Sequence, residues 1–240
     1  MVKTKVTVLG CGDMAHSHQT TSSFMVQNID SRCILLFDCG YNVFPKLLNE
    51  YKEQIEFIED VFISHLHADH VGSLGALIYY RFFIYGKKTR VISDPVVLPQ
   101  LEQLLKIMVP NVVDLKDMNL RCYNQKCYNL AHGANTFVVD HMGIPACGLV
   151  YEAGLNNYIV FTGDTDILNP GNIYIQKAKA IFHDCTINVI PPGVHAYIDD
   201  IYDKYPKEIR DKIILVHHGV KDVKYILSMK VAQEGDVFEI

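Results

Sequence analysis

The sequence predicts a single-domain α/β sandwich, because the chain is of single-domain length, rich in apolar residues, and has strands that repeatedly end in histidine or aspartate. It has 240 residues, 49% of them hydrophobic and 20% charged, which is a globular composition with enough apolar material for a large core. Three apolar runs in the second half end at polar triplets, at 162–164, 183–185 and 217–219. Strands that deliver such groups to one edge of a layered sheet are typical of a ligand site. We therefore expect one domain over residues 1–240.

Strands and helices alternate in the first half of the predicted fold. Short apolar, β-branched runs bounded by turn residues predict strands at Val6–Leu9, Ser23–Gln27, Cys33–Phe37 and Val61–Ile63. Helical spacing of apolar residues predicts helices at Phe44–Tyr51, Val71–Phe83 and Pro99–Val109, the last of which is ended by Pro110.

The second half is predominantly strand-like. The predicted strands are Arg121–Leu130, Thr136–Asp140, Gly148–Tyr151, Tyr158–Phe161, Ala180–Phe182 and Lys212–Val216. Helices between them are expected to cover the outer faces of the sandwich.

The bulk composition favours a cytoplasmic protein without a membrane anchor. The sequence has no run of about 18 apolar residues that would make a transmembrane helix, and Met1–Val6 is typical of the start of a strand rather than a signal peptide. The seven cysteines are scattered and odd in number, which favours a reducing compartment. The net charge of −5 does not indicate nucleic-acid binding.

The segment His65-Leu66-His67-Ala68-Asp69-His70 carries the strongest chemical signal in the chain. Three imidazoles and a carboxylate within six residues, directly after an apolar strand, are costly to bury unless each polar atom has a partner. A divalent metal supplies that partner, since imidazole nitrogen and carboxylate oxygen are common ligands of Zn²⁺ and its neighbours. His65 and His67 can converge from the strand end, while Asp69 and His70 open the next helix and point elsewhere. The motif therefore predicts two adjacent metal ions.

This HxHxDH pattern resembles the signature of the metallo-β-lactamase superfamily at every fixed position. Two further elements support the resemblance, Asp38-Cys39-Gly40 after a strand and Thr162-Gly163-Asp164-Thr165. The resemblance implies an αββα sandwich with two divalent ions, Zn²⁺ or alternatively Mn²⁺. It further implies the following ligands: His65, His67 and His141 for one ion, Asp69, His70 and His217 for the other, and Asp164 between the two.

Three of these ligands lie far from the motif in sequence. His141 follows the predicted strand that contains Val138 and Val139, and Asp164 follows another strand. His217 and His218 compete for one ligand position. The family uses the histidine directly after the apolar strand, which favours His217 and leaves His218 as the alternative.

Within the superfamily, the chain is most similar to the ribonuclease Z branch and to its armless phosphodiesterase relatives, such as the phage anti-Pycsar cyclic-nucleotide phosphodiesterases. His183-Asp184-Cys185-Thr186 resembles the His-Glu-Ala-Thr element of the branch, and His195 lies where the branch has its proton-donating histidine. The long basic arm that grips tRNA does not fit between His141 and Asp164, which are separated by 22 residues. The acidic residue that the branch carries just before Gly-Asp-Thr is also missing, and Asp184 is a candidate substitute.

These features predict a phosphodiesterase that hydrolyses a small phosphodiester, most simply a cyclic nucleotide, with a metal-bridging hydroxide as the nucleophile. Asp69 would orient the nucleophile or accept its proton, and His195 would protonate the departing oxygen. The branch also implies a homodimer, to which the aromatic helix containing Tyr79 and Phe83 could contribute. The alternatives are a tRNA 3′-processing endonuclease, a lactone, ester or β-lactam hydrolase, and a non-catalytic nucleotide-binding protein.

Overall fold

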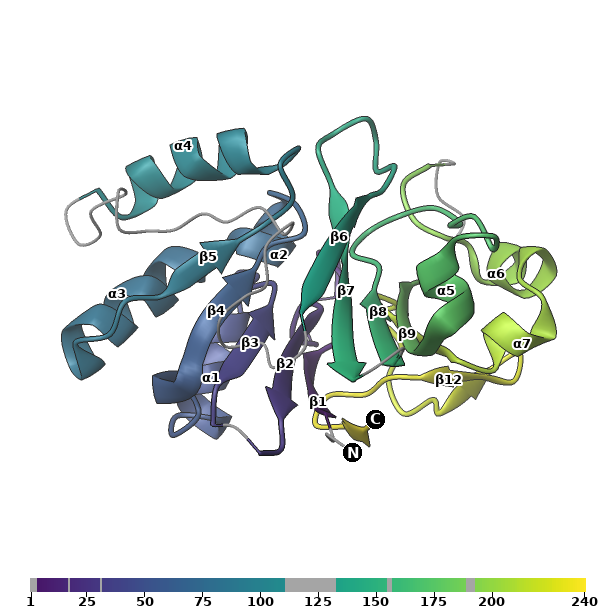
Figure 1. The fold of residues 1–240 in the computed structure, drawn as a ribbon, viewed down its shortest axis with the longest axis horizontal. Coiled ribbons are helices and arrows are strands. Elements are labelled where there is room, and N and C mark those ends of the chain that lie inside the picture. The colour runs from purple at the N-terminus through teal and green to yellow at the C-terminus, as the bar shows by residue number, and fades with distance from the viewer. Residues whose placement is uncertain (1–3, 17, 31, 111–132, 155–156, 189–192) are drawn as a thin grey trace.

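Two β-sheets pack face to face, and helices cover their outer sides (Figure 1). The computed structural model describes residues 4–16, 18–30, 32–110, 133–154, 157–188 and 193–240. In Figure 1, helices α1 to α4 lie on the side of the first sheet, and α5 to α7 lie on the side of the second. The predicted αββα sandwich is therefore confirmed.

The first sheet is built mainly from the N-terminal half of the chain. Its strands lie in the order β13 (Val237–Glu239), β1 (Thr4–Gly10), β2 (Ser23–Asn28), β3 (Ile34–Phe37), β4 (Ile58–Phe62) and β5 (Arg90–Ile92). The first three pairings are antiparallel, whereas β3–β4 and β4–β5 are parallel. The carboxyl ends of β3 and β4 therefore meet at the same edge of the sheet.

The second sheet repeats this arrangement with the C-terminal half. Its order is β11 (Tyr225–Ile226), β12 (Met229–Val231), β10 (Ile213–Val216), β9 (Ala178–Asp184), β8 (Asn157–Phe161), β7 (Cys147–Gly154) and β6 (Ala134–Val138). Strands β8, β9 and β10 run parallel to one another, so the polar triplets that follow them lie at one edge. Ligand sites in α/β sheets usually form outside such carboxyl ends.

The helices are short and lie between the strands in the order of the sequence. They are α1 (Val43–Glu50), the 3₁₀ helix η1 (Ile55–Phe57), α2 (Ala68–Val71), α3 (Leu74–Tyr85), α4 (Leu98–Met108), α5 (Ile173–Lys177), α6 (Ile198–Lys204) and α7 (Lys207–Arg210). Helix α3 ends at Gly86, whose φ of 63° is the left-handed conformation that glycine adopts readily.

Aromatic side chains join the two sheets at the centre of the sandwich. Phe24 of β2 lies 5.3 Å from Phe161 of β8 and 5.1 Å from Phe182 of β9, measured between ring centroids. Phe37 of β3 lies 5.2 Å from Phe161. All four rings are buried, and such pairs add about 0.5–1.5 kcal/mol each beyond the area that they bury. The packed core therefore fixes the position of one sheet relative to the other, and with it the two sheet edges that carry the polar residues.

Most predicted elements appear within a few residues of their expected bounds, with one correction. The continuous helix predicted over Val71–Phe83 is wrong, because α2 ends at Val71 and α3 begins at Leu74. Between them the amide of Ser73 donates to the carbonyl of Cys39 instead of to its own helix, at 3.0 Å. The strand predicted at Arg121–Leu130 lies outside the described residues. Strands β5 and β11 to β13 were not predicted, since each has only two or three residues.

Four cysteines in the described part of the chain are buried free thiols. Cys11, Cys39, Cys147 and Cys185 are buried, and Cys33 is half-buried. Among the described helices, none combines the length and the apolar content needed to cross a membrane.

Candidate metal centre

The first group of candidate ligands comes from one short stretch that follows β4. His65 and His67 lie in the turn after this strand, and Asp69 and His70 lie in α2, where the chain reverses. Gly40 permits this turn to pack closely, because a Cβ atom at Gly40 would lie 1.9 Å from the backbone oxygen of Asp69. The histidines and aspartate of the motif are thereby directed to one edge of the first sheet.

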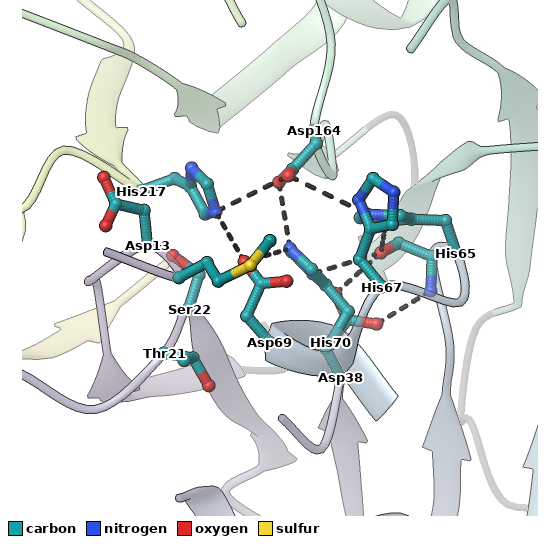
Figure 2. Close-up of polar contacts among 12 residues, drawn as sticks. Asp13, Thr21, Ser22, Asp38, His65, His67, Asp69, His70, Asp164 and His217 are labelled. Atoms are coloured by element: carbon teal, nitrogen blue, oxygen red, sulfur yellow. Dashed lines mark hydrogen bonds and ion pairs between the residues drawn. The ribbon is translucent and has the colours of Figure 1, made fainter. Parts of the chain in front are cut away.

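Three strand ends of the second half bring the remaining candidates to the same place. His141 follows β6, Asp164 follows β8 and His217 follows β10. Figure 2 shows Asp164 and His217 facing the residues of the HxHxDH motif. His65, His67 and His141 form one cluster, and Asp69, His70, Asp164 and His217 form another, each with candidate ligand atoms within 4.8 Å of one another. A third group, Asp164, Asp184, His195 and His217, shares two of its residues with the second.

Asp164 lies between the two clusters. Its Oδ2 atom is 3.8 Å from Nε2 of His65 and 3.9 Å from Nε2 of His141, both in the first cluster. In the second cluster, its Oδ1 lies 3.2 Å from Nε2 of His70, and its Oδ2 lies 3.5 Å from Nε2 of His217. One carboxylate thus faces imidazoles of both groups, as a ligand shared by two cations would.

The chemistry of the donor set fits divalent cations. Among the described residues, Nε2 of His65, Nε2 of His70 and Oδ1 of Asp69 are buried side-chain atoms without a hydrogen-bond partner. Leaving such atoms unpaired costs about 1–3 kcal/mol each. They belong to residues that crowd around one point together with Asp164, so cations at that point would satisfy them.

Hydrogen bonds behind the cluster fix the orientation of two imidazoles. Nδ1 of His70 donates to Oδ2 of Asp38 at 2.8 Å, and Asp38 also accepts from the amide and hydroxyl of Ser64, each at 2.7 Å. Nδ1 of His141 donates to the carbonyl oxygen of Val194 at 2.7 Å. In both rings Nδ1 is thereby engaged behind the cluster and Nε2 faces the cluster, which is how metal-binding histidines are usually held.

Sequence reasoning gave Asp38 no role. The structure places it at the end of β3, fully buried, with a φ of 57° that non-glycine residues adopt rarely. Such strain tends to occur at functional sites. The signal that could have found Asp38 is the one that found Asp164, namely a carboxylate directly after an apolar strand.

The electrostatics of the buried cluster divide its histidines into two classes. Burial disfavours the charged form of His65, His70 and His217, and for His65 it combines with the charge of His70 to hold the pKa well below its ordinary value. For His70 the charges of Asp164 and Asp38 outweigh burial and hold the pKa well above the ordinary value. The same holds for His217, where Asp164 and Asp184 supply the negative charge. His65 therefore has a free lone pair, whereas His70 and His217 carry protons that a cation must displace.

His217, not His218, joins the cluster. Nε2 of His217 lies 3.3 Å from Oδ2 of Asp69 and its Nδ1 lies 3.4 Å from Oδ1 of Asp184. His218 points away, and its two ring nitrogens contact the carbonyl oxygen of Ala232 and the amide of Val220. His217 has a φ of 61°, so the chain turns sharply at this residue and brings its ring into the cluster.

His195 lies at the edge of the cluster and pairs with Asp184. Its Nδ1 donates to Oδ2 of Asp184 at 2.7 Å and lies 3.8 Å from Oδ2 of Asp164. Burial opposes protonation of His195, but the hydrogen bond to Asp184 and its charge outweigh burial and raise the pKa above the ordinary value. Cations bound nearby would act against this rise. Asp184 thus occupies the pairing role for which the sequence made it a candidate.

The glycine-rich loop after β1 forms a rim beside the cluster. The carbonyl oxygen of Cys11 in this loop accepts from the amide of His218 at 3.1 Å. Oδ1 of Asp13 accepts from the amides of Ala15 and His16 and lies 2.6 Å from Nδ1 of His16. His18 is exposed. The two histidines of this loop therefore lie outside the candidate ligand groups.

Comparisons with known proteins identify a family and agree with the fold. The profile of the family described as anti-Pycsar protein Apyc1 matches residues 4–238. The anti-Pycsar protein Apyc1 of Bacillus phage BSP38 is 27% identical over 234 residues, which cover 90% of this chain and 89% of that protein.

Two solved structures share the fold. The metallo-β-lactamase fold protein YhfI of Bacillus subtilis superposes with a TM-score of 0.76 at 20% identity and covers 99% of both chains. The short form of human tRNase Z superposes with a TM-score of 0.72 at 16% identity and covers 98% of both chains. The expected metallo-β-lactamase fold is confirmed by these likenesses.

Proposed function

The chain belongs to the family of the anti-Pycsar protein Apyc1, and from this premise we propose that it is a metal-dependent phosphodiesterase that hydrolyses a cyclic nucleotide. The position of Asp164 carries the proposal. Its carboxylate lies within 4 Å of imidazoles from two clusters, His65 and His141 on one side and His70 and His217 on the other. Such a shared ligand is the mark of a paired-metal site, and paired metals are widely used to hydrolyse phosphodiesters.

The ligands that we propose are those of the two clusters. His65, His67 and His141 hold one ion, Asp69, His70 and His217 hold the other, and Asp164 lies between them. Nitrogen and oxygen donors of this kind suit Zn²⁺, with Mn²⁺ as the alternative.

The protein contributes orientation and proton transfer. Two divalent ions held at this site would supply water activated at neutral pH and would neutralise the charge that develops on the phosphate oxygens. Asp69, whose Oδ1 has no hydrogen-bond partner, is placed to orient the attacking water or to accept its proton. His195, held by Asp184 at 2.7 Å, is the proposed donor of a proton to the departing oxygen.

The small size of the proposed substrate rests on what lies between His141 and Asp164. The 22 residues from 142 to 163 hold β7 and β8, which pair with each other and belong to the sheet. An arm that could reach along a tRNA does not fit in this interval. The net charge of −5 also makes a poor surface for a long phosphate backbone.

We also propose that the chain forms a homodimer. Phe83 and Ile84, at the end of α3, are 68% and 60% exposed, and the ring of Phe83 stacks on Tyr79 at 6.0 Å between centroids. Apolar side chains that protrude together are common where two copies of a chain meet. Light scattering on the purified protein measures its mass directly, and a monomer at micromolar concentration would contradict this proposal.

The test of the proposed function is a substrate screen with Zn²⁺- and Mn²⁺-loaded protein. The panel contains 2′,3′- and 3′,5′-cyclic nucleotides, bis(p-nitrophenyl) phosphate, precursor tRNA, lactones and nitrocefin. We expect turnover of at least one cyclic nucleotide and none of the tRNA. Turnover of lactones or nitrocefin alone would indicate a carbon-ester or β-lactam hydrolase. Nucleotide binding without hydrolysis, unchanged in the Asp164→Ala variant, would indicate a binding protein.

A further inference from the structure

A buried histidine and tyrosine lie behind the candidate site, on the outer face of the second sheet. Successive residues of a strand point to opposite faces, so Asp184 at the end of β9 faces the site, and His183 faces the helices. Nε2 of His183 lies 2.9 Å from the hydroxyl oxygen of Tyr205, which follows α6. His183 is 0% and Tyr205 1% exposed. Neither side chain has a part in the chemistry described above.

The hydrogen bonds of this pair can run in one direction only. Nδ1 of His183 lies 2.6 Å from the backbone carbonyl oxygen of Asp184, which can only accept, so Nδ1 carries the proton. Nε2 of the neutral ring is then an acceptor, and the Tyr205 hydroxyl donates to it. The phenol oxygen in turn accepts from the amide of Leu168 at 2.9 Å. Burial lowers the pKa of His183 and raises that of Tyr205, which keeps both groups neutral.

Both ends of this hydrogen-bonded chain lie in segments that build the surroundings of His195. At one end is Asp184, whose carboxylate Oδ2 accepts from Nδ1 of His195 at 2.7 Å and from the amide of Thr165 at 2.8 Å. At the other end is Leu168, in the loop that begins with Asp164 and Thr165. The hydrogen bonds through Tyr205 and His183 therefore connect the loop that contains Asp164 to the backbone of Asp184 on the outer face of the sheet. On the side of the site, the Asp184 carboxylate connects to the same loop through the amide of Thr165.

We propose that Tyr205 and His183 are positioning residues that hold Asp184, and through it His195, in place to protonate the departing oxygen. The inference rests on the proposed function. In hydrolysis a bond forms between phosphorus and the water oxygen, and the bond from phosphorus to the leaving oxygen breaks. The proton that the water loses passes to Asp69 or to solvent, and the leaving oxygen takes its proton from His195.

This role makes the dependence on the leaving group diagnostic. A ribose oxygen leaves as a strongly basic alkoxide and needs the proton, whereas p-nitrophenolate is a stable anion and leaves without one. A variant in which His195 is misplaced therefore slows hydrolysis of a cyclic nucleotide but spares bis(p-nitrophenyl) phosphate. A variant that merely loosens the fold or loses metal slows both reactions together.

The first experiment compares Tyr205→Phe with Tyr151→Phe as metal-loaded proteins. Tyr151 of β7 is equally buried, at 2% exposure. Its variant also loses one buried hydroxyl, but it leaves the hydrogen bonds of Tyr205 and His183 intact. For Tyr205→Phe we expect kcat on a 3′,5′-cyclic nucleotide to fall about tenfold, part of the 10²–10⁴-fold that a general acid contributes. Turnover of bis(p-nitrophenyl) phosphate should stay within about twofold, and Tyr151→Phe should change neither rate.

Two further variants and one spectroscopic readout separate positioning from folding. His183→Gln keeps an oxygen that can accept from Tyr205 and should retain more cyclic-nucleotide activity than His183→Ala. In metal-free protein, the Nδ1 proton of His195 observed by NMR should exchange with solvent faster in Tyr205→Phe than in Tyr151→Phe.

Equal losses on both diesters, or unchanged kcat and proton exchange in Tyr205→Phe, would overturn the inference. If the unaltered enzyme hydrolyses neither diester, the proposed function fails first, and the inference fails with it.

Discussion

The two halves of the candidate metal centre are assembled by different means. On the first sheet, His65, His67, Asp69 and His70 come from six consecutive residues in the turn after β4 and the start of α2. On the second sheet, His141, Asp164 and His217 come from three strand ends up to 76 positions apart in the chain. Local backbone geometry determines the first half, whereas the pairing of strands in the second sheet, antiparallel next to β6 and parallel from β8 to β10, determines the second. A substitution next to the HxHxDH motif should therefore displace only residues of the first half. A substitution that disturbs the second sheet should displace residues of the second half even when it lies far from them in sequence.

The support behind the two halves differs in the same way. In the first half His70 is held by Asp38, which is itself fixed by Ser64, its partner at 2.7 Å. In the second half the Asp184 carboxylate contacts two imidazoles. Its Oδ1 lies 3.4 Å from Nδ1 of His217, and its Oδ2 lies 2.7 Å from Nδ1 of His195. One carboxylate thus supports a single candidate ligand in the first half, but a candidate ligand and a proposed proton donor in the second.

The largest effect should come from the carboxylate of the second half that also faces imidazoles of the first half. Replacing Asp164 by alanine removes the shared carboxylate, which contributes several kcal/mol, so we expect activity to fall by about 10³-fold or more. Metal content measured by mass spectrometry should fall by at least one ion per chain. The matched control is Asp166→Ala on the same loop, outside the candidate ligand groups. An active Asp164→Ala enzyme with both ions bound would show that the halves are independent.

A comparison of neighbouring histidines tests whether strand register alone selects the ligand. We expect His217→Ala to lose about 10²-fold or more in activity, on the scale of removing one direct electrostatic contact at an active site. His218→Ala should lose about 1–3 kcal/mol of unfolding free energy, because its hydrogen bonds are buried, with activity per folded molecule preserved. Kinetics and denaturant unfolding of both variants provide the measurement. The opposite result would assign the ligand to His218.

Asp38→Asn tests the local support of the first half. The amide cannot accept the His70 and Ser64 hydrogen bonds as the carboxylate does, so we expect metal affinity to fall about 10–100-fold. The control is Asp60→Asn on β4, which removes an equally buried carboxylate that pairs with Arg90 away from the cluster. Competition with a chelator measures the affinities. Equal weakening in both variants would mean that Asp38 acts only through stability.

The smallest effect concerns pH. In the metal-free protein the pKa values of His70 and His217 are held above the ordinary value, by Asp164 in both cases against the opposing effect of burial. Below these pKa values both rings are protonated, so a cation must displace protons and its affinity falls as the pH falls. Each proton displaced should weaken binding about tenfold per pH unit. Calorimetry in buffers of different ionisation enthalpy counts the protons, and a count of zero would contradict the assignment of these two ligands.

Sequence patterns predicted more of the strands than of the helices. Apolar runs such as Ile159–Phe161 and Ile213–Val216 predicted central strands because these are buried on both faces. The broken helix at Ser73 could not be predicted, since its amide bonds to Cys39, 34 positions away in sequence. The two- and three-residue strands gave no periodic signal and depend on pairing with longer neighbours. The extent of the domain, the ligand roles and the dimer remain predictions.

The sequence by itself determined the chemistry of the centre. The residue types, their number and their position after apolar strands predicted a paired cation site, because a packed core does not tolerate unpaired imidazoles and carboxylates. Only the tertiary structure decided which groups meet. It placed Asp38 behind His70 and directed His217, rather than His218, into the cluster. It also brought Asp184 into contact with His195 on one face of the sheet and with His183, the partner of Tyr205, on the other. The physical reason is that side-chain direction depends on strand register, on sheet packing and on a left-handed φ at residues such as His217, none of which the sequence encodes locally.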